Sequence, residues 1–258
     1  MNIAFASTSQ TGARESNQDQ IGTMLGENSA CFIVCDGVAG SPGGGEAAKI
    51  ACHTLLRTLQ DNKHFTAEDT RLAVEKSART LREAQGINPK LQHMSTTLAA
   101  LFIDRDYSLS WWAHAGDSRI YHFRRGYINR VTSDHSLAQQ MKEAGYENTG
   151  INSNLLYNAL GVDTAGYVAF SEMLTLEDGD AFLVCSDGFW LSLQAEEMEL
   201  ALRMVNSPDE WLTLMLKAID RGAASDNLSA IAVWVGSPQE TTLLYSLADS
   251  ARLMPPRD

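Results

Sequence analysis

Three aspartates at the borders of apolar segments are the residues of this sequence that are best placed to do chemistry. Asp36 and Asp187 each stand close behind an apolar run and are followed by glycine, and Asp226 stands just before another such run. Runs of this kind are typical of strands covered on both faces, so each carboxylate marks a strand end. Unpaired charge beside a core is costly. If the three carboxylates meet, a hard divalent cation is the simplest group that could neutralise them.

Periodicity and turn signals predict the strands that would carry these residues. The expected strands are 3–9, 20–25, 30–36, 96–103, 108–115, 118–123, 127–131, a strand near Val168, 181–185 and 228–235. Strands 20–25 and 30–36 are expected to form a hairpin. The tight connections within 96–131 favour an antiparallel meander. The polar stretch from Tyr146 to Asn154 is expected to be a surface loop.

Helices are expected between these strands. The glycine-rich stretch 40–45 opens one helix, and 66–85 forms a second that begins with a capping box. Ser136 leads into a short helix, and Ser207 caps the second of two later helices. Antiparallel strands interleaved with helix pairs indicate an α+β fold, in which two stacked sheets carry helices on their outer faces.

The composition limits the classes of protein to which the chain can belong. Its 258 residues are 44% apolar, and no low-complexity tract interrupts them, so we expect one domain over 1–237 and a tail over 238–258 with room for a short helix. The net charge of −12 disfavours binding to nucleic acid or an anionic membrane. Signal-peptide and membrane-spanning patterns are missing, and we expect a cytoplasmic monomer. The four cysteines form no CxxC pair, which argues against zinc.

Short polar motifs follow one another along the chain in a specific order. They are Arg14-x-x-Asn17-Gln18-Asp19, Asp36-Gly37-Val38-Ala39-Gly40, Met94-Ser95-Thr96-Thr97, Gly116-Asp117-Ser118-Arg119, Asn158-Ala159-Leu160-Gly161, Ser186-Asp187-Gly188 and Asp226-Asn227. Each motif alone is weak, but the ordered set resembles the metal-dependent Ser/Thr protein phosphatases of the PP2C family, in particular the compact bacterial members. The resemblance covers nearly the whole chain.

The resemblance implies a four-layer α/β/β/α sandwich with two central, mainly antiparallel sheets and a binuclear Mg²⁺ or Mn²⁺ centre at one end. By position, Asp36 would bridge the two metals, the Gly37 carbonyl would hold the second, and Asp187 and Asp226 would hold the first. Asp117 fits the position that helps to bind a third, weaker ion. Oxygen-only ligands suit Mg²⁺ or Mn²⁺. Phosphoserine and phosphothreonine would be hydrolysed by direct attack of a metal-bridging water or hydroxide.

Other positions either complete the family pattern or depart from it. Arg14 fits the residue that clamps the phosphate, because its planar fork matches two phosphoryl oxygens. Asp19 and Gln18 would lie behind the metal ligands, Asp19 orienting metal-bound water and Gln18 replacing the glutamate of many eukaryotic relatives. Val38 replaces the histidine proposed there as general acid, so the proton donor is not identified. The segment 135–160 is shorter than the expected flap.

Each proposed role has a plainer structural alternative. The three strand-end aspartates could serve ordinary turns, and Asp117 could cap a tight turn. Arg14 could be a solvated charge on a loop. Asp19 could serve simply as a hydrogen-bond partner of a neighbouring turn. Threonines 96 and 97 and the histidines at 114, 122 and 135 are expected to be structural, since lone histidines in or beside strands are usually satisfied core residues.

Two other functions compete with that of a protein phosphatase. A catalytically silent relative would only bind a phosphoprotein or regulate a partner, but such members should have lost at least one of the aspartates. A hydrolase of small phosphate esters could share the fold. The resemblance further implies a phosphoprotein substrate of a Ser/Thr kinase, with regulation of a type VI secretion system as a weaker expectation.

Overall fold

The computed structural model describes residues 1–38, 42–146, 155–162, 167–220 and 226–238. Its strands are β1 (Ile3–Gln10), β2 (Asp19–Leu25), β3 (Ser29–Asp36), β4 (Leu98–Asp104), β5 (Leu109–Ala115), β6 (Arg119–Arg124), β7 (Tyr127–Val131), β8 (Ala169–Phe170), β9 (Leu174–Thr175), β10 (Ala181–Cys185) and β11 (Leu228–Val235). Its helices are α1 (Gly44–Gln60), α2 (Ala67–Ile87), the 3₁₀ turn η1 (Pro89–Leu91), α3 (Leu137–Glu143), α4 (Asp187–Trp190), α5 (Ala195–Met204) and α6 (Pro208–Asp220).

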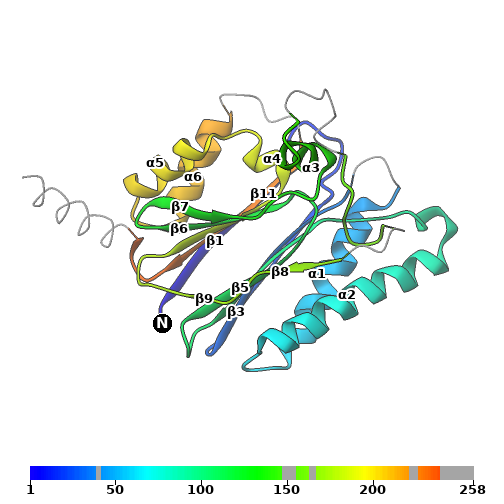
Figure 1. Cartoon of the computed structure of the whole chain (residues 1–258), viewed down its shortest axis with the longest axis horizontal. Helices are drawn as coiled ribbons and strands as arrows, with labels where there is room; N and C mark the ends of the chain where they lie inside the picture. Colours follow the sequence, from blue (N-terminus) through cyan, green and yellow to red (C-terminus); the bar gives the residue numbers. More distant parts are fainter. Residues whose placement is uncertain (39–41, 147–154, 163–166, 221–225, 239–258) are drawn as a thin grey trace, which may run out of the picture.

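The strands form two antiparallel sheets that stack face to face. One sheet has the order β1-β11-β10-β6-β7, and the other has the order β2-β3-β4-β5-β8, with β9 also paired to β5. The pair α1 and α2 covers the outer face of the second sheet, and α5 and α6 cover the outer face of the first (Figure 1). The expected α+β sandwich with helices outside is confirmed.

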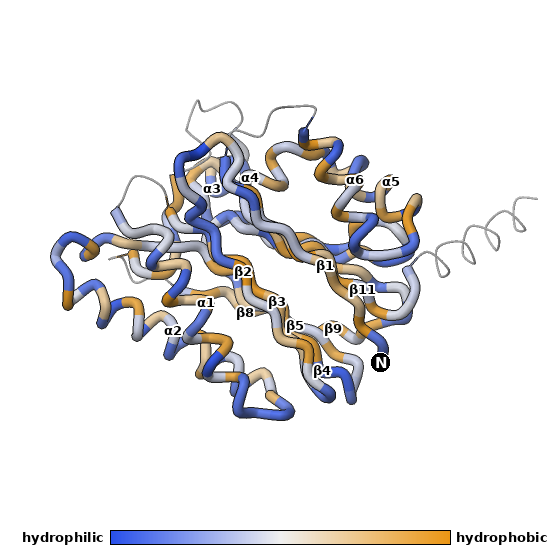
Figure 2. Tube along the Cα trace, turned by 180° about the vertical axis from the view of Figure 1, so that it is seen from behind, coloured by the Kyte–Doolittle hydropathy of each residue, from blue (hydrophilic) through white to orange (hydrophobic). Residues whose placement is uncertain are grey.

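Three layers of apolar side chains hold the two sheets and the two helix pairs together. A single strand can contribute side chains to two of these apolar layers. In β3, Phe32 and Val34 face the other sheet, whereas Ile33 and Cys35 face the helices. Every residue of β4, β10 and β11 is buried, so these strands lack a polar face. Figure 2 shows the corresponding apolar colour along β11 and the neighbouring central strands. The continuous apolar runs in the sequence therefore report burial on both faces.

The first and last described strands are neighbours in the same sheet. β1 pairs with β11 along its whole length, from Ile3 opposite Val235 to Gln10 opposite Leu228. β11 therefore lies between β1 and β10 and holds the sheet together.

The predicted meander over 96–131 is wrong in one respect. β4 and β5 pair in one sheet, but β6 pairs with β10 in the other, so the chain crosses between the sheets at Gly116-Asp117-Ser118. Gly116 has a φ of 100°, a conformation that side chains other than glycine rarely adopt. A short turn signal does not distinguish a hairpin from such a crossover, and the pattern alone therefore favoured continuous pairing.

Several local expectations can also be compared with the structure. The Thr66–Asp69 capping box is present at the start of α2. At α6, Ser207 caps the helix as predicted, because its Oγ accepts from the Glu210 N–H, and the Glu210 carboxylate accepts from the N–H of Asn206. The short helix α4 and strand β9 were not predicted. Most of the expected surface loop (147–154) and of the tail (239–258) lies outside the described residues.

Candidate active site

A cleft of about 410 Å³ lies at the end of the sandwich where α3 and α4 are found (Figure 1). Its lining includes nearly all residues predicted for a metal centre and a phosphate clamp: Arg14, Gln18, Asp36, Gly37, Asp117, Asp187 and Asp226. They come from strand ends and connections distant in the sequence, and the antiparallel strands bring these ends together. Asp19 does not line the cleft but lies directly behind it.

Asp36 is held by the backbone and side chains of two threonines. Its N–H donates to Thr97 Oγ1 at 2.9 Å, and its carbonyl accepts from the Thr97 N–H at 2.8 Å and from Thr96 Oγ1 at 2.9 Å. Thr97 Oγ1 also lies 2.6 Å from Ser118 Oγ. The threonines therefore link the end of β3 to the crossover between the sheets, which agrees with the structural role expected of them.

The position of Gly37 leaves no room for a side chain. An added Cβ would lie 2.3 Å from the carbonyl carbon of Gly44, at the start of α1. The Gly37 N–H donates to the Gln18 carbonyl at 3.2 Å, and a Cβ on Gly44 would meet Gln18 Oε1 at 2.7 Å. Helix α1, Gly37 and Gln18 thus pack backbone against backbone. This close packing explains why glycines are needed here.

Asp187 is the first residue of α4, and the residue before it bonds to a buried carboxylate. Ser186 Oγ donates to Asp19 Oδ2 at 2.9 Å, so Asp19 is tied to the segment that carries Asp187. Asp19 also pairs in register with Asp36 between β2 and β3. Its other oxygen, Oδ1, is buried and has no hydrogen-bond partner among the described residues. Asp19 therefore lies beside Asp36 and has one buried oxygen that no hydrogen bond uses.

Arg14 and Asp226 form a pair at the mouth of the cleft. Arg14 Nε and Nη2 donate to the two Asp226 oxygens at 2.8 and 2.7 Å. Asn227 fixes the surrounding loop, because its Nδ2 donates to the carbonyls of Thr11 and Ser16 and its Oδ1 accepts from the Gln18 N–H. Sequence reasoning assigned Asn227 no role, since hydrogen bonds to distant backbone leave no periodic signal.

Burial and mutual repulsion set the charge state of the acidic groups. Desolvation, followed by the charges of Asp19 and Asp187, raises the pKa of Asp36 well above its usual value. Burial is also the largest cause of the raised pKa values of Asp19 and Asp187. Burial, followed by the charges of Asp187 and Asp134, raises the pKa of Asp117 to about 7. As separate anions these carboxylates disfavour one another, so the cluster favours a bound cation.

These observations fit divalent metal ions of the hard type. The donors in the cleft are carboxylate and carbonyl oxygens, which are the ligands that Mg²⁺ and Mn²⁺ prefer. The unpartnered Asp19 oxygen and the elevated carboxyl pKa values are both what a cation or its waters would relieve.

A model of the family described as protein phosphatase 2C matches residues 7–231. The chain belongs to the protein phosphatase 2C family. It is 28% identical to the serine/threonine phosphatase stp of Listeria welshimeri over 238 residues, which cover 85% of this chain and 90% of that protein.

Solved structures of this fold are similar over almost the same span. The serine/threonine phosphatase PstP/Ppp of Mycobacterium tuberculosis has a TM-score of 0.79 and 23% identity, with 91% of this chain and 99% of that chain covered. A structure of the PstP catalytic domain contains two manganese ions. PppA of Pseudomonas aeruginosa, described as a key regulatory component of a type VI secretion system, has a TM-score of 0.75 and 23% identity, with 91% and 98% covered.

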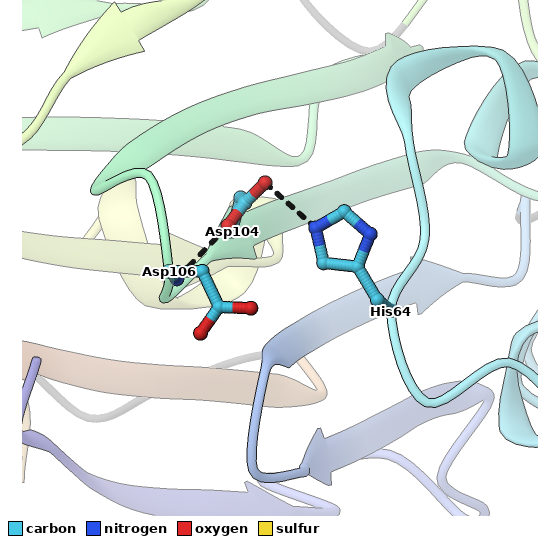
Figure 3. Close-up of side chains that lie close together, drawn as sticks. All are labelled: His64, Asp104 and Asp106. Carbon is cyan, nitrogen blue, oxygen red and sulfur yellow. Dashed lines mark hydrogen bonds and ion pairs between the residues drawn. The ribbon is translucent and has the colours of Figure 1, made fainter.

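A second group of metal-type side chains lies at the opposite end of β4 and has a plainer explanation. Asp104 Oδ2 lies 2.9 Å from His64 Nε2, and Asp104 Oδ1 accepts from the N–H groups of Asp106 and Tyr107 (Figure 3). Asp106 accepts from Asn28 Nδ2 at 2.8 Å. Asp104 Oδ1 thus stabilises the β4–β5 turn and Oδ2 holds His64, so both oxygens have partners, unlike those of Asp19.

The three histidines considered in the sequence do not line the cleft. Burial lowers the pKa of His114 to about 3, and the His114 ring packs against the His135 ring at a tilt, with ring centroids 4.6 Å apart. His135 accepts from Asn158 Nδ2 at its Nδ1. His122 is fully buried near Asp180. Their contacts agree with the structural roles expected of them.

Within the part of the chain that the structure describes, no helix has the length and apolar composition to cross a bilayer.

Proposed function

We propose that this PP2C-family chain hydrolyses phosphoserine and phosphothreonine in proteins, with divalent metal ions held in the cleft. One observation supports this most directly: four buried or half-buried aspartates from separate segments converge on one cleft beside a single arginine fork. A phosphomonoester dianion would be repelled by these carboxylates alone, so the reaction needs bound cations.

The residues divide between two ions and a weaker third. Asp36 would bridge the first two, with Asp187 and Asp226 on one side and the Gly37 carbonyl on the other. Asp117 would hold the third. When bound, the ions supply an activated water and positive charge for the phosphoryl oxygens. The chain's own part is to fix the ligand positions, which it does through the Thr97 bonds to Asp36.

The remaining groups bind and orient the substrate. Arg14 would turn from Asp226 to two phosphoryl oxygens, which its planar fork matches. Gln18 and Asp19 would orient metal-bound waters, Asp19 through its free Oδ1. Val38 lines the cleft but has no ionisable group, so another group must protonate the leaving serine or threonine oxygen.

The biological setting follows from the relatives. We infer a phosphoprotein substrate made by a Ser/Thr kinase, because the curated relatives are named serine/threonine phosphatases. Regulation of a type VI secretion system is a weaker proposal, because the likeness to PppA is one of fold. We further propose that 1–237 act as one phosphatase domain and that the chain works as a cytoplasmic monomer.

The test is Asp36→Asn, measured on a phosphopeptide and on a small phosphate ester with Mn²⁺ present. Turnover should fall by several orders of magnitude, because a lost metal ligand commonly costs several kcal/mol in the transition state. Asp104→Asn is the matched control, since Asp104 is also a buried strand-end aspartate but lies outside the cleft. Retention of more than roughly a tenth of wild-type turnover by a folded Asp36→Asn would refute the bridging role.

The choice of substrate separates the rival functions. A protein phosphatase should prefer the phosphopeptide in kcat/KM, whereas a hydrolase of small esters should prefer the small substrate. A wild-type chain that binds phosphopeptide and Mn²⁺ but turns over neither substrate would instead be a silent binding module.

A further inference from the structure

Two of the aspartates in the cleft lie just beyond the end of a strand pair, since β6 and β10 are paired as far as Arg119 opposite Cys185. Asp117 belongs to the crossover from β5 to β6, and Asp187 begins the single-turn helix α4. One side chain joins the two segments: Trp190, the last residue of α4, donates its indole N–H to the Asp117 carbonyl at 2.9 Å. The bond spans 73 residues of sequence.

The indole ring is itself fixed from the other side. The Arg119 guanidinium carbon lies 3.2 Å from the centre of the Trp190 ring. Arg119 cannot turn freely, because its Nε and Nη2 donate to the two oxygens of the buried Asp134, each at 2.8 Å, and its Nη1 donates to Tyr121 Oη at 3.0 Å. Asp134 holds Arg119 in place, and Arg119 lies over the Trp190 ring. These contacts therefore fix the orientation and the position of the indole.

The crossover is also held by His135. The His135 N–H donates to the Gly116 carbonyl at 2.8 Å, and the Gly116 N–H donates to His135 Nδ1 at 3.3 Å. These bonds anchor the crossover to the segment before α3. They make no connection to α4. Beyond the last strand pair, Arg119 opposite Cys185, the indole of Trp190 supplies a hydrogen bond between the crossover and α4.

We propose that Trp190 is a positioning residue that sets the distance between the Asp117 and Asp187 carboxylates. The inference rests on the proposed function, in which both aspartates hold metal ions. Removal of the indole N–H takes away the bond to the Asp117 carbonyl, so we expect the Asp117 carboxylate to shift while Asp36, Asp187 and Asp226 keep their places. The first two ions should then still bind, and the chemical step should slow.

The test compares Trp190→Phe with Trp211→Phe. Trp211 makes the same kind of bond, from its indole N–H to the Met198 carbonyl at 3.1 Å, but it is a fully buried residue of α6 and does not line the cleft. Trp190→Phe should lower kcat on a phosphopeptide by on the order of tenfold at unchanged KM and raise the half-saturating Mn²⁺ concentration. Trp211→Phe should lower only the melting temperature. Trp190→Tyr serves as a second variant with the same expected outcome.

A double-mutant cycle shows whether the effect passes through Asp117. In an Asp117→Asn background, Trp190→Phe should have almost no further effect on kcat, because the group that it positions is already gone. Full additivity, or wild-type kcat and Mn²⁺ dependence in both Trp190 variants, would overturn the inference. A wild-type chain without turnover would instead refute the proposed function, and calorimetric titration with Mn²⁺ would still decide whether Trp190 acts on the metal centre.

Discussion

The pairing of Arg14 with Asp226 leads to a prediction about metal affinity. The two groups meet through two hydrogen bonds, so both Asp226 oxygens are engaged by the guanidinium. If Asp226 holds a metal ion, that ion must compete with Arg14. Arg14→Ala should therefore tighten Mn²⁺ binding, although it removes a residue that the phosphatase needs for its substrate.

The size of the effect follows from the exposure of the pair. The side chains of Arg14 and Asp226 are 50% and 32% exposed, so solvent screens the interaction. A pair of this kind contributes about 0.5–1 kcal/mol, which corresponds to roughly a two- to fivefold lower Kd for the ion that Asp226 holds. The same variant should raise KM for a phosphopeptide more than it lowers kcat, because the fork contacts phosphoryl oxygens in both the ground and transition states.

Isothermal calorimetry with Mn²⁺ on the metal-free protein measures the affinity directly. Arg203→Ala is the control for net charge, since Arg203 lies on α5 near Glu199 and outside the cleft. An unchanged or weaker Mn²⁺ affinity in Arg14→Ala would show that the ion and the arginine do not compete for Asp226. An unchanged KM would show that Arg14 does not clamp the phosphate.

Three further predictions concern the other cleft residues. Asp117→Asn should lower kcat while calorimetry still finds two tight Mn²⁺ ions; loss of those ions would move Asp117 into the binuclear site. Because burial raises the Asp117 pKa from 3.8 to about 7, its contribution to the stability of the metal-free fold falls as pH rises through that window. The melting temperature of the wild type should therefore fall more steeply between pH 4 and 8 than that of Asp117→Asn. Parallel curves would contradict the raised pKa of Asp117. Gln18→Glu should add charge near the second ion and lower the half-saturating Mn²⁺ concentration; an unchanged titration would place Gln18 too far from that ion.

Residues with a local signal were predictable from the sequence. Asp36 ends β3 and Asp187 lies two residues beyond β10, and the structure brings both to one cleft, as the strand-end pattern indicated. The Thr66 capping box is a motif of four adjacent residues, so it too could be recognised without a structure.

Contacts between distant segments had no such signal. The bond from Trp190 to the Asp117 carbonyl joins α4 to the crossover between the sheets, and neither segment carries a periodic pattern. The same holds for the Arg14–Asp226 pair: the sequence gives the chemistry of each group, but it does not show that they meet. The crossover at Gly116 was missed because the turn residues that reverse a hairpin also allow the chain to change sheets.

The pairing of β1 with β11 has a consequence for how the protein is made on the ribosome. β1 leaves the exit tunnel first, yet its hydrogen-bonding partner begins only at Leu228. Until that segment emerges, β1 and β10 each lack a neighbour, and their exposed edges must be kept from aggregating. Asp226 is synthesised directly before β11. A nascent chain therefore cannot complete the cleft before Asp226 has been translated, and the enzyme should remain inactive until β11 pairs with β1 and β10.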